Sequence, residues 1–414
     1  MPPDASRFDY IPIATDEHAA QYVRILAHSF GRAESDSALW VERFDRANCR
    51  VLVENDKAVA GLIIIRMGQF FGGRSVPKIG VAAVGTAPEA RGRGVATELM
   101  RRFVLETHAE GIPIAGLYPA TQKLYRGVGF EQSGHKFDLR MPLGSVGIKD
   151  FELNVRPFED ADKPRIYAFY TREARQIDGH LDRAPINWDR IERPPPSRID
   201  PARAFVVESD GSGISKRGDI EGYVFLTQVM PPIPNRGKHE IHVHDMIAAT
   251  PRASRRLWSF LAGYATLAPE MQWYTGPAHP MLAMLPEQPF RMTNQMHWMT
   301  RIIDVPRALE ARGYLAGLSC VLRLQISDPL VPGNSGAFVM EVREGHAVVS
   351  RDRGLGSRAA TTLSATINGL AALFTGYLSP AALRSIGMIE GEEDALRTAT
   401  AIFAGPTPWM PDMY

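Results

Sequence analysis

A turn rich in glycine and arginine, placed between an apolar strand and an amphipathic helix, is the feature that most constrains the fold. It lies in the segment "VPKIGVAAVGTAPEARGRGVATELMRRF", from Val76 to Phe103. Backbone amides at the start of a helix are free to bind anions, and the helix dipole favours negative charge there. A tight turn alone has no need of Arg91 and Arg93, so the segment predicts a binding site for an anion.

Two common phosphate-binding motifs do not fit this turn. A dinucleotide fingerprint has a third glycine where this chain has Thr97, and a Walker loop has Gly-Lys followed by Ser or Thr. The turn instead reads Arg91-x-x-Gly94-x-Ala96, which offers backbone amides and guanidinium groups to phosphate oxygens. We therefore expect a ligand that carries a pyrophosphate. A surface turn with solvated arginines is the alternative, which so short a pattern does not exclude.

The surrounding pattern alternates strands and helices, which predicts an α/β domain over residues 1–150. Apolar, β-branched runs predict the strands, and a 3.6-residue apolar period predicts the helices. The expected strands are 10–14, 49–56, 57–70, 76–87, 112–119 and 135–143, and the expected helices begin near Asp16, at the turn and near Thr121. The second and third strands are joined at Asn55-Asp56-Lys57, which predicts a hairpin.

A second copy of this pattern follows over residues 151–292. Its segment "VHDMIAATPRASRRLWSFLAGY" (243–264) repeats the strand, the turn and the helix, and Pro251 aligns with the proline of the first copy. However, Leu257 stands where the first copy has Gly94. A leucine fills the space in which a ligand would approach the backbone, so we expect the second copy to be a degenerate scaffold without the anion site.

The third region, residues 293–414, is expected to be a small α+β domain. Strand-like runs at 320–327 and 336–350 precede an apolar, helix-rich segment at 360–387, which is better explained by core packing than by a lipid pocket. The chain continues into "AGPTPWMPDMY", in which proline excludes regular structure. A frayed tail is the usual alternative for a terminus, but the large apolar side chains favour packing and the prolines lower the ordering entropy.

Composition excludes several classes of function. The net charge is +1, from 47 Lys and Arg against 46 Asp and Glu, so no overall field attracts nucleic acid or an anionic membrane. Cys49 and Cys320 provide neither a disulfide framework nor a metal cluster, which is typical of a reducing cytoplasm. The first residues lack the pattern of an export signal, and the apolar run 58–65 is too short to span a bilayer. We expect a cytoplasmic protein.

Histidines at 239, 242 and 244, with Glu240 and Asp245, form the one constellation that suggests a metal. Alternate residues of a strand share a face, so His242 and His244 could converge. Histidines that pack in a core or an interface are more common, and no metal is predicted.

The glycine–arginine turn resembles the acetyl-CoA motif of the GNAT N-acetyltransferases, Arg/Gln-x-x-Gly-x-Gly/Ala between a strand and a helix. A second GNAT signature, a Tyr followed by x-x-x-Gly-Phe, is matched by "KLYRGVGF" (123–130). Two such copies followed by a domain similar to a sterol carrier protein are typical of Eis-type (enhanced intracellular survival) acetyltransferases, which "RIIDVPRALEARGY" (301–314) also resembles. The resemblance implies a functional GNAT fold, a degenerate one and a sterol-carrier-like domain whose C-terminal tail reaches the active site. It also implies a homo-oligomer, a hexamer.

The resemblance assigns roles to residues of the first copy. Strand backbone at 84–86 would hold the pantetheine arm of acetyl-CoA, and the turn and helix start would hold its pyrophosphate. The implied cofactor-binding residues are Val84, Gly85, Thr86, Arg91, Gly92, Arg93, Gly94, Val95, Ala96, Thr97, Ala120 and Thr121. Tyr125 occupies the position of the general acid, and Tyr414 would supply its α-carboxylate as general base. Ala120 departs from the family pattern, which has a serine five residues before the tyrosine.

Proton chemistry agrees with these two roles. An ammonium acceptor must lose a proton before its nitrogen attacks the thioester, and the CoA thiolate must gain one. A phenol with a pKa near 10 is a suitable donor to a thiolate with a pKa near 8.5. An α-carboxylate with a pKa near 3.5 is a weak base unless it is desolvated, although it also stabilises a cationic acceptor. The alternative for Tyr125 is an aromatic side chain packed beside Phe130.

The resemblance also implies the acceptor, a primary amine of a polycationic small molecule such as an aminoglycoside. Glu34 and Asp36, in a loop after the first helix, would attract it, and Phe30 and Trp40 would form walls. Acetylation of a peptide or protein lysine is the second enzymatic hypothesis. A lipid-binding protein with a vestigial GNAT fold is the non-enzymatic one, against which the intact first-copy motif argues.

Overall fold

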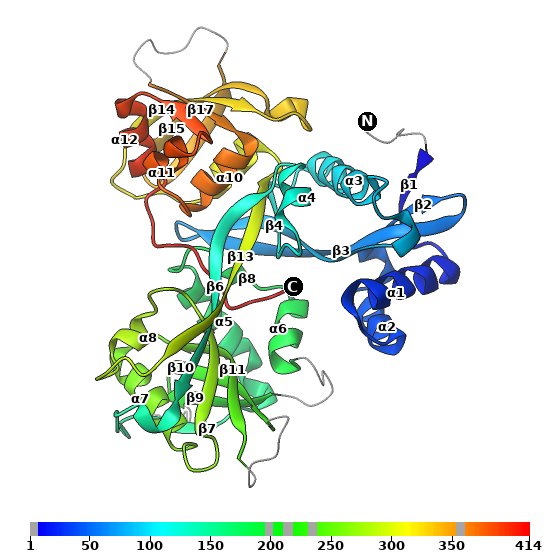
Figure 1. Cartoon of the computed structure of the whole chain (residues 1–414). Helices are drawn as coiled ribbons and strands as arrows, with labels where there is room; N and C mark the ends of the chain where they lie inside the picture. The colour runs from blue at the N-terminus through cyan, green and yellow to red at the C-terminus, as the bar shows by residue number, and fades with distance from the viewer. Residues whose placement is uncertain (1–6, 195–201, 210–217, 231–237, 353–360) are drawn as a thin grey trace. The chain divides into compact units, whose positions relative to one another are not determined.

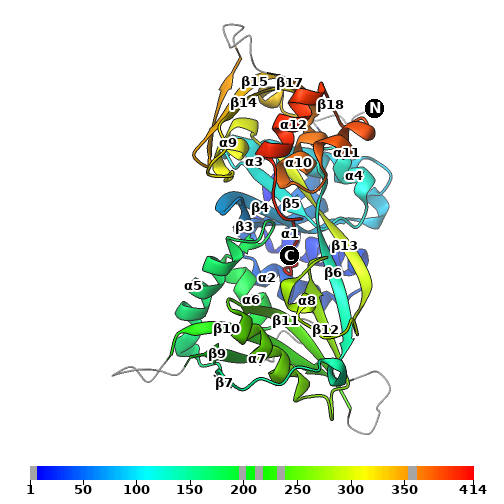
Figure 2. The ribbon, with the colours of Figure 1, turned by 90° about the vertical axis from the view of Figure 1, so that its left-hand side faces the viewer.

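The computed structural model describes residues 7–194, 202–209, 218–230, 238–352 and 361–414 (Figures 1 and 2). The chain divides into two compact units. The first unit comprises residues 1–134, 297–406 and 413–414, and the second comprises residues 135–296 and 407–412. Strands β6 (Glu131–Pro142) and β13 (Arg291–Ile302) each contribute residues to both units.

The main sheet of the first unit has the order β1-β2-β3-β4-β5-β13. Its strands are β1 (Asp9–Pro12), β2 (Cys49–Glu54), β3 (Lys57–Phe71), β4 (Arg74–Thr86) and β5 (Ile114–Leu117), with residues 299–302 of β13. All neighbours are antiparallel except β4 and β5, which are parallel. Asn55 and Asp56 have φ of 49° and 60° in the hairpin between β2 and β3, so the hairpin prediction is confirmed.

Helices cover both faces of this sheet (Figure 1). Helices α1 (Asp16–Phe30) and α2 (Glu34–Arg43) lie on one face, and α3 (Val95–Ala109) lies on the other, followed in the chain by α4 (Gln122–Arg126). Helix α1 packs closely because Gly61 has no side chain: a Cβ there would lie 2.6 Å from the buried ring of Tyr22. The sequence had predicted α1, α3 and α4 but not α2.

The first unit also contains a second sheet, of order β16-β15-β14-β17-β18. Its strands are β14 (Cys320–Ser327), β15 (Gly336–Arg343), β16 (His346–Arg351), β17 (Thr362–Thr366) and β18 (Ile389–Gly391). The helices of this region are α9 (Val305–Ala311), α10 (Ile367–Thr375), α11 (Pro380–Ser385) and α12 (Glu393–Ile402). Eight of the nine residues of α10 are buried, so the predicted core packing holds for this helix.

The second unit repeats the α/β pattern of the first. Its sheet has the order β6-β12-β11-β10-β9-β7, and its single parallel pair, β11 with β12, corresponds to β4 with β5. The elements are β7 (Asn154–Pro157), α5 (Lys163–Ala174), β8 (Leu181–Asp182), α6 (Pro185–Glu192), β9 (Arg203–Glu208), β10 (Ile220–Val229), β11 (Glu240–Ala248), α7 (Pro251–Ala262), β12 (Glu270–Thr275) and α8 (Pro280–Ala283). Figure 2 shows α7 lying across one face of this sheet.

The internal repeat is therefore confirmed, while the chain-order boundaries near residues 150 and 292 stay predictions. Within the described residues, no helix combines the length and the apolar character needed to span a membrane.

Candidate active site

The parallel strands β4 and β5 are paired over only three residues each and then part. Their register joins Lys78–Gly80 to Ile114–Gly116, whereas β4 continues to Thr86 beside β3. We call the place where they part the β4–β5 fork. The predicted residues Val84, Gly85 and Thr86 lie on β4 beyond this fork, in the position expected for backbone that a ligand contacts.

Local geometry distorts β4 just before these residues. Ala83 has a φ of +52°, and its carbonyl oxygen accepts a hydrogen bond of 2.7 Å from the hydroxyl of Tyr22. Gly85 permits the close approach of α1, because a Cβ there would lie 2.9 Å from Cγ2 of Ile25. The bulged strand is thus held by α1 on one face, and a change of its backbone would disturb both elements.

The turn between β4 and α3 has the geometry of an anion cradle. Gly92 and Gly94 have φ of +76° and +78°, a region that glycine enters without steric cost. Gly94 is the N-cap residue of the 15-residue helix α3, and no side chain caps that helix. A Cβ on Gly92 would meet nothing within 4 Å, so the turn is open to a ligand. The first backbone amides of α3, from Val95 to Thr97, can therefore donate hydrogen bonds to phosphate oxygens.

The two arginines of the turn are not equivalent. Nη2 of Arg93 lies 2.7 Å from both carboxylate oxygens of Glu54, which also pairs with Arg7. Hydrogen bonding by Arg93 is the largest influence that lowers the pKa of Glu54. Arg91 is exposed and forms no ion pair with any residue that the structure describes. Arg91 is the arginine that can turn to a phosphate without breaking an existing pair.

Tyr125 lies on α4 and is almost completely buried. Its ring packs against Phe130 in an edge-to-face arrangement, with centroids 6.1 Å apart. Burial raises the pKa of its hydroxyl to about 12, so the phenol keeps its proton over the working range of pH. The packing against Phe130 and the predicted role as an acid are therefore compatible.

Tyr414 packs at the β4–β5 fork, so the tail is not frayed. Two glycines provide the space: a Cβ on Gly80 would lie 2.9 Å from the ring of Tyr414, and one on Gly116 would lie 3.0 Å from its Oη. The ring contacts Tyr118 edge to face at 6.0 Å, and the Lys78 ammonium lies 5.0 Å from its centroid. Sequence reasoning identified Tyr414 but missed these four neighbours.

Lys78 is the clearest of the missed residues. It is 2% exposed, and its Nζ donates to Oε1 of Gln69 at 2.9 Å. Its ammonium also lies 5.5 Å from the ring centroid of Trp298. A lysine inside the apolar run "VPKIGVAAV" is the signal that could have found it, because a buried charge needs specific partners.

The residues predicted to bind the acceptor require one correction. Glu34 and Asp36 do not lie in a loop but form the acidic first turn of α2, where negative charge favours the helix dipole. Neither carboxylate takes part in an ion pair or hydrogen bond with another described residue. Phe30 is 47% exposed at the end of α1, and Trp40 packs against Phe44 with centroids 5.2 Å apart and ring planes tilted by 30°.

The two remaining residues predicted to bind the cofactor, Ala120 and Thr121, directly precede α4. Ala120 and Thr121 are exposed, and Thr121 is the N-cap residue of that helix. Thr121 forms no side-chain cap hydrogen bond.

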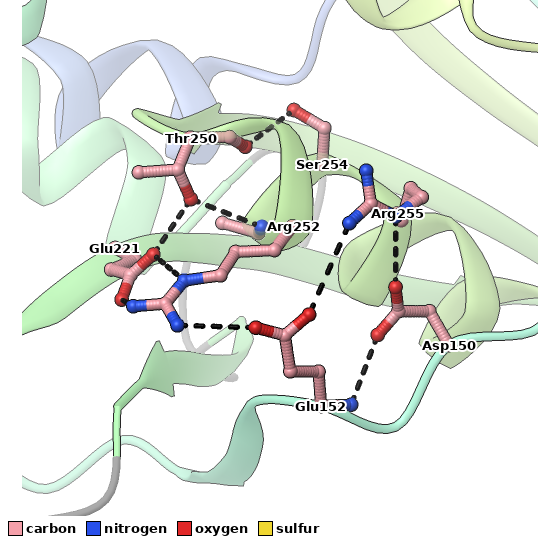
Figure 3. A network of polar contacts seen from close by, with 8 residues as sticks. Asp150, Glu152, Glu221, Thr250, Arg252, Ser254 and Arg255 are labelled. Carbon is pink, nitrogen blue, oxygen red and sulfur yellow. Dashed lines mark hydrogen bonds and ion pairs between the residues drawn. The ribbon is translucent and has the colours of Figure 1, made fainter.

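The second unit has a different structure at the place of the cradle (Figure 3). Thr250 caps α7 by accepting a hydrogen bond from the amide of Ala253, and Pro251 removes one amide. Glu221 accepts hydrogen bonds from Oγ1 of Thr250 at 2.7 Å and from Nε of Arg252 at 2.9 Å. The Thr250 hydroxyl thus caps the helix start, and the carboxylate of Glu221 lies beside it.

Three further ion pairs complete this network in Figure 3. Arg252 also contacts Glu152 at 3.1 Å, and Arg255 contacts Asp150 at 2.9 Å and Glu152 at 4.0 Å. The expected equivalence of Leu257 and Gly94 is wrong: Gly94 is the N-cap residue of α3, whereas Leu257 is fully buried inside α7 and Thr250 takes the N-cap position there. The second copy has therefore replaced an open cradle by an internally neutralised one.

The histidines of β11 are engaged in hydrogen bonds. His244 contacts Oγ1 of Thr227 at 2.8 Å, His242 contacts Glu240 at 3.3 Å, and His239 contacts Gln228 at 2.8 Å. No three potential metal ligands converge among the described residues.

Three family models match the sequence. An acetyltransferase (GNAT) domain matches residues 11–133, a second acetyltransferase (GNAT) domain matches residues 179–302, and a sterol carrier protein domain matches residues 305–411. The predicted fold class, two tandem α/β domains of the GNAT type and a sterol-carrier-like α+β domain, is confirmed.

Similar proteins cover nearly the whole chain. A solved structure of a GCN5-related N-acetyltransferase from Anabaena variabilis is 33% identical, with a TM-score of 0.90 over 99% of this chain and 100% of that one. An uncharacterized N-acetyltransferase of Streptomyces avermitilis is 27% identical over 82% of each chain. N-acetyltransferase Eis of Mycobacterium tuberculosis is 24% identical over 80% of this chain and 79% of its own.

Proposed function

Because the chain belongs to the GCN5-related N-acetyltransferase family, in its Eis-type group, we propose that it acetylates primary amines of polycationic small molecules such as aminoglycosides. Acetyl-CoA supplies the activated acetyl group as a thioester. The observation that carries the proposal is the conjunction of an open anion cradle at α3 with a buried tyrosine on α4 and another at the β4–β5 fork.

The cradle and the β4 edge are suited to holding acetyl-CoA. Gly92, Gly94 and the amides at 95–97 would bind the pyrophosphate, with Arg91 as the mobile cation. Beyond the fork β5 no longer pairs with β4, so the backbone of β4 at 84–86 has one free edge. The pantetheine arm would bind along this edge. These residues would position the thioester and bind the negative charge of the pyrophosphate.

Proton transfer is proposed for the two tyrosines. Tyr125, protonated because burial raises its pKa to about 12, would donate a proton to the CoA sulfur as the C–S bond breaks. Tyr414, through its α-carboxylate, would accept a proton from the acceptor ammonium and stabilise its charge before that transfer. The packing of Tyr414 against Gly80 and Gly116 supports a fixed position for this residue.

A cationic acceptor is supported by the start of α2 and the end of α1. Glu34 and Asp36 offer two exposed carboxylates, and the exposed ring of Phe30 already has a guanidinium group, that of Arg32, 6.0 Å from its centroid. A peptide or protein lysine presents a single ammonium and would make less use of paired carboxylates.

A panel of acceptors tests the proposal. Turnover is measured with acetyl-CoA and each of several aminoglycosides, lysine peptides and arylamines. We expect kcat/KM to be highest for aminoglycosides. A higher kcat/KM for lysine peptides would show that the acceptor is a peptide or protein lysine. If no acceptor of the panel is acetylated, only the proposed binding of acetyl-CoA stands.

Paired substitutions test the acceptor site. Replacing Glu34 and Asp36 by Gln and Asn should raise KM for aminoglycosides with little change in kcat, since binding rather than proton transfer is weakened. Glu390→Gln is the matched control, because Glu390 is an exposed carboxylate of β18. An unchanged KM in the double variant would remove these two residues from the acceptor site.

The resemblance further supports a homo-oligomer of six chains as part of this proposal. Light scattering coupled to size-exclusion chromatography measures the mass directly, against 45.8 kDa for one chain.

A further inference from the structure

The tail segment 407–412 is bound to the second unit by backbone hydrogen bonds. The amide of Trp409 donates to the carbonyl of Asp178 at 3.1 Å, and that of Met410 donates to the carbonyl of His135 at 3.2 Å. The amide of His135 donates to the carbonyl of Pro408 at 3.0 Å, which completes a short parallel bridge. The tail is thus docked on β6 like one more piece of strand.

Trp409 is held by three residues of the same unit. Its ring lies edge-on to His180, with centroids 4.4 Å apart and planes at 83°, and is 5.5 Å from His279. Gly276 provides the space, because a Cβ there would lie 2.6 Å from the indole. A larger residue at position 276 would displace the indole.

The tail occupies the place that corresponds to the β4–β5 fork. Strands β11 and β12 pair from Glu240–Val243 to Glu270–Trp273 and then part. A pocket of about 270 Å³ lies there, and its walls include residues 245–249, Trp273, Trp409 and Pro411. Where a GNAT fold receives the arm of its cofactor, this unit has bound a piece of its own chain.

A buried arginine fixes the end of the tail segment. Nε and Nη2 of Arg183 lie 2.9 and 3.2 Å from the two carboxylate oxygens of Asp412, and Nη1 lies 2.6 Å from Asp245. The guanidinium stacks 3.7 Å from the ring centroid of Tyr170, and Tyr223 donates a hydrogen bond of 2.7 Å to Asp245. All three charged side chains are at most 3% exposed, so the bidentate pair has a single defined geometry.

We infer that the second GNAT-fold domain has exchanged cofactor binding for a tail clamp, formed by His180, Arg183, Gly276 and His279, that positions Tyr414 for catalysis. Two residues of extended chain span at most about 7 Å, so fixing Asp412 restricts where Tyr414 can lie. Arg183 is a positioning residue that acts through Asp412. The inference rests on the proposed role of Tyr414 in proton transfer.

Two tail variants and one control test the clamp in the full-length protein. Trp409→Ala removes the indole, and Asp412→Asn keeps the shape but weakens the bidentate pair with Arg183. Thr407→Ala is the control, because Thr407 is an exposed tail residue. Hydrogen exchange at the amides of Trp409 and Met410 reports tail docking, calorimetry reports acetyl-CoA affinity, and kcat is measured with the best acceptor of the panel.

We expect both clamp variants to exchange these amides at least 10-fold faster and to lower kcat about 10²-fold, the effect of a small misplacement of a reacting group. Acetyl-CoA affinity should change less than twofold, because its proposed site lies in the first unit. Slow exchange in both variants, or fast exchange with wild-type kcat, would overturn the inference. If the wild-type protein turns over no acceptor, the proposed function fails, while slow exchange in wild type and fast exchange in the variants would still show the clamp.

Discussion

Arg301 and Asp328 form an ion pair of 2.7 Å in which neither side chain is exposed to solvent. Asp328 follows β14, and it also accepts a hydrogen bond of 2.9 Å from Nδ2 of Asn334. The guanidinium of Arg301 lies beside Gly129, where φ is +89° and a Cβ would lie 2.6 Å from Nε of the arginine. The structure therefore explains the glycine of the Tyr-x-x-x-Gly-Phe signature. A side chain at Gly129 would collide with Arg301, which Asp328 of the sterol-carrier-like domain holds in place by the ion pair.

Loss of this ion pair should destabilise the protein strongly. In Asp328→Ala, Arg301 stays buried without its carboxylate, and breaking a buried pair costs about 3–5 kcal/mol. Urea denaturation measures the change in the free energy of unfolding. Glu393→Gln is the control, because its partner Arg384 and Glu393 itself are largely exposed, and such pairs contribute about 1 kcal/mol or less. An equal loss of unfolding free energy in Asp328→Ala and Glu393→Gln would show that the buried ion pair contributes no more than the exposed one.

The two arginines of the cradle should differ in their effect on acetyl-CoA binding. Arg91→Ala removes a guanidinium that is free to reach a phosphate, and a charge-assisted hydrogen bond contributes about 1.5–3 kcal/mol, or roughly 10- to 150-fold in Kd. Arg93→Ala should have a smaller effect, because Arg93 is engaged with Glu54. Titration calorimetry with acetyl-CoA measures both. A larger rise in Kd for Arg93→Ala than for Arg91→Ala would show that Arg93, and not Arg91, binds the phosphate.

Wild-type protein should bind one acetyl-CoA per chain, and Gly94→Leu should bind none. The substitution places a large side chain at the N-cap of α3, at a φ of +78° that strains any side chain. Gly387→Leu is the matched control, since Gly387 has a φ of +71° and open space around it. Titration calorimetry measures the number of acetyl-CoA molecules bound per chain. A stoichiometry of two in wild type would show that the network of Glu221 and Arg252 does not close the second cradle.

Tyr125→Phe should lower kcat about 10²- to 10⁴-fold, the usual contribution of a general acid. Its acetyl-CoA affinity should stay within twofold, because the cradle is untouched. A raised pKa means that the hydroxyl loses its proton only near pH 12, so the defect should be the same from pH 6 to pH 9. Tyr264→Phe serves as the control. Wild-type turnover in Tyr125→Phe would leave Tyr125 as a packing residue beside Phe130.

Local patterns explain what the sequence could predict. The hairpin at Asn55-Asp56 and the cradle depend on neighbouring residues, and so do most of the strands and helices around them. The match of Leu257 to Gly94 failed, because the link between β11 and α7 is shorter than the link between β4 and α3. Helix α2 was missed because Glu34 and Asp36 resemble a polar loop, although acidic residues are also typical of a first helical turn.

Contacts between distant residues explain what the sequence could not predict. Arg183 and Asp412 are 229 positions apart, and nothing near either residue indicates the other. The same holds for the glycines that receive Tyr414, because Gly80 and Gly116 look like ordinary strand glycines until the ring is placed. Residue types indicated the candidate acid and base, but only the fold shows which residues pack against them.

Three histidines of the second unit should make the protein sensitive to mild acid. Burial lowers the pKa of His180 to about 3 and those of His244 and His279 to about 4, against about 6.5 in an unfolded chain. Between pH 6.5 and pH 4 the unfolded state therefore binds protons that the folded state does not. Stability is present above pH 6.5 and is lost as pH falls through this window, by up to about 1.4 kcal/mol per pH unit for each histidine.

Urea denaturation at pH 7.5, 6.0 and 5.0 tests this expectation, within a range in which most carboxylates stay ionised. His279→Gln should reduce the slope of stability against pH by about one proton. Since His180 and His279 also contact Trp409, the amides at 409 and 410 should exchange faster at pH 5 than at pH 7.5 after correction for intrinsic rates. A free energy of unfolding that is constant from pH 7.5 to pH 5.0 would show that these imidazoles are protonated equally in both states.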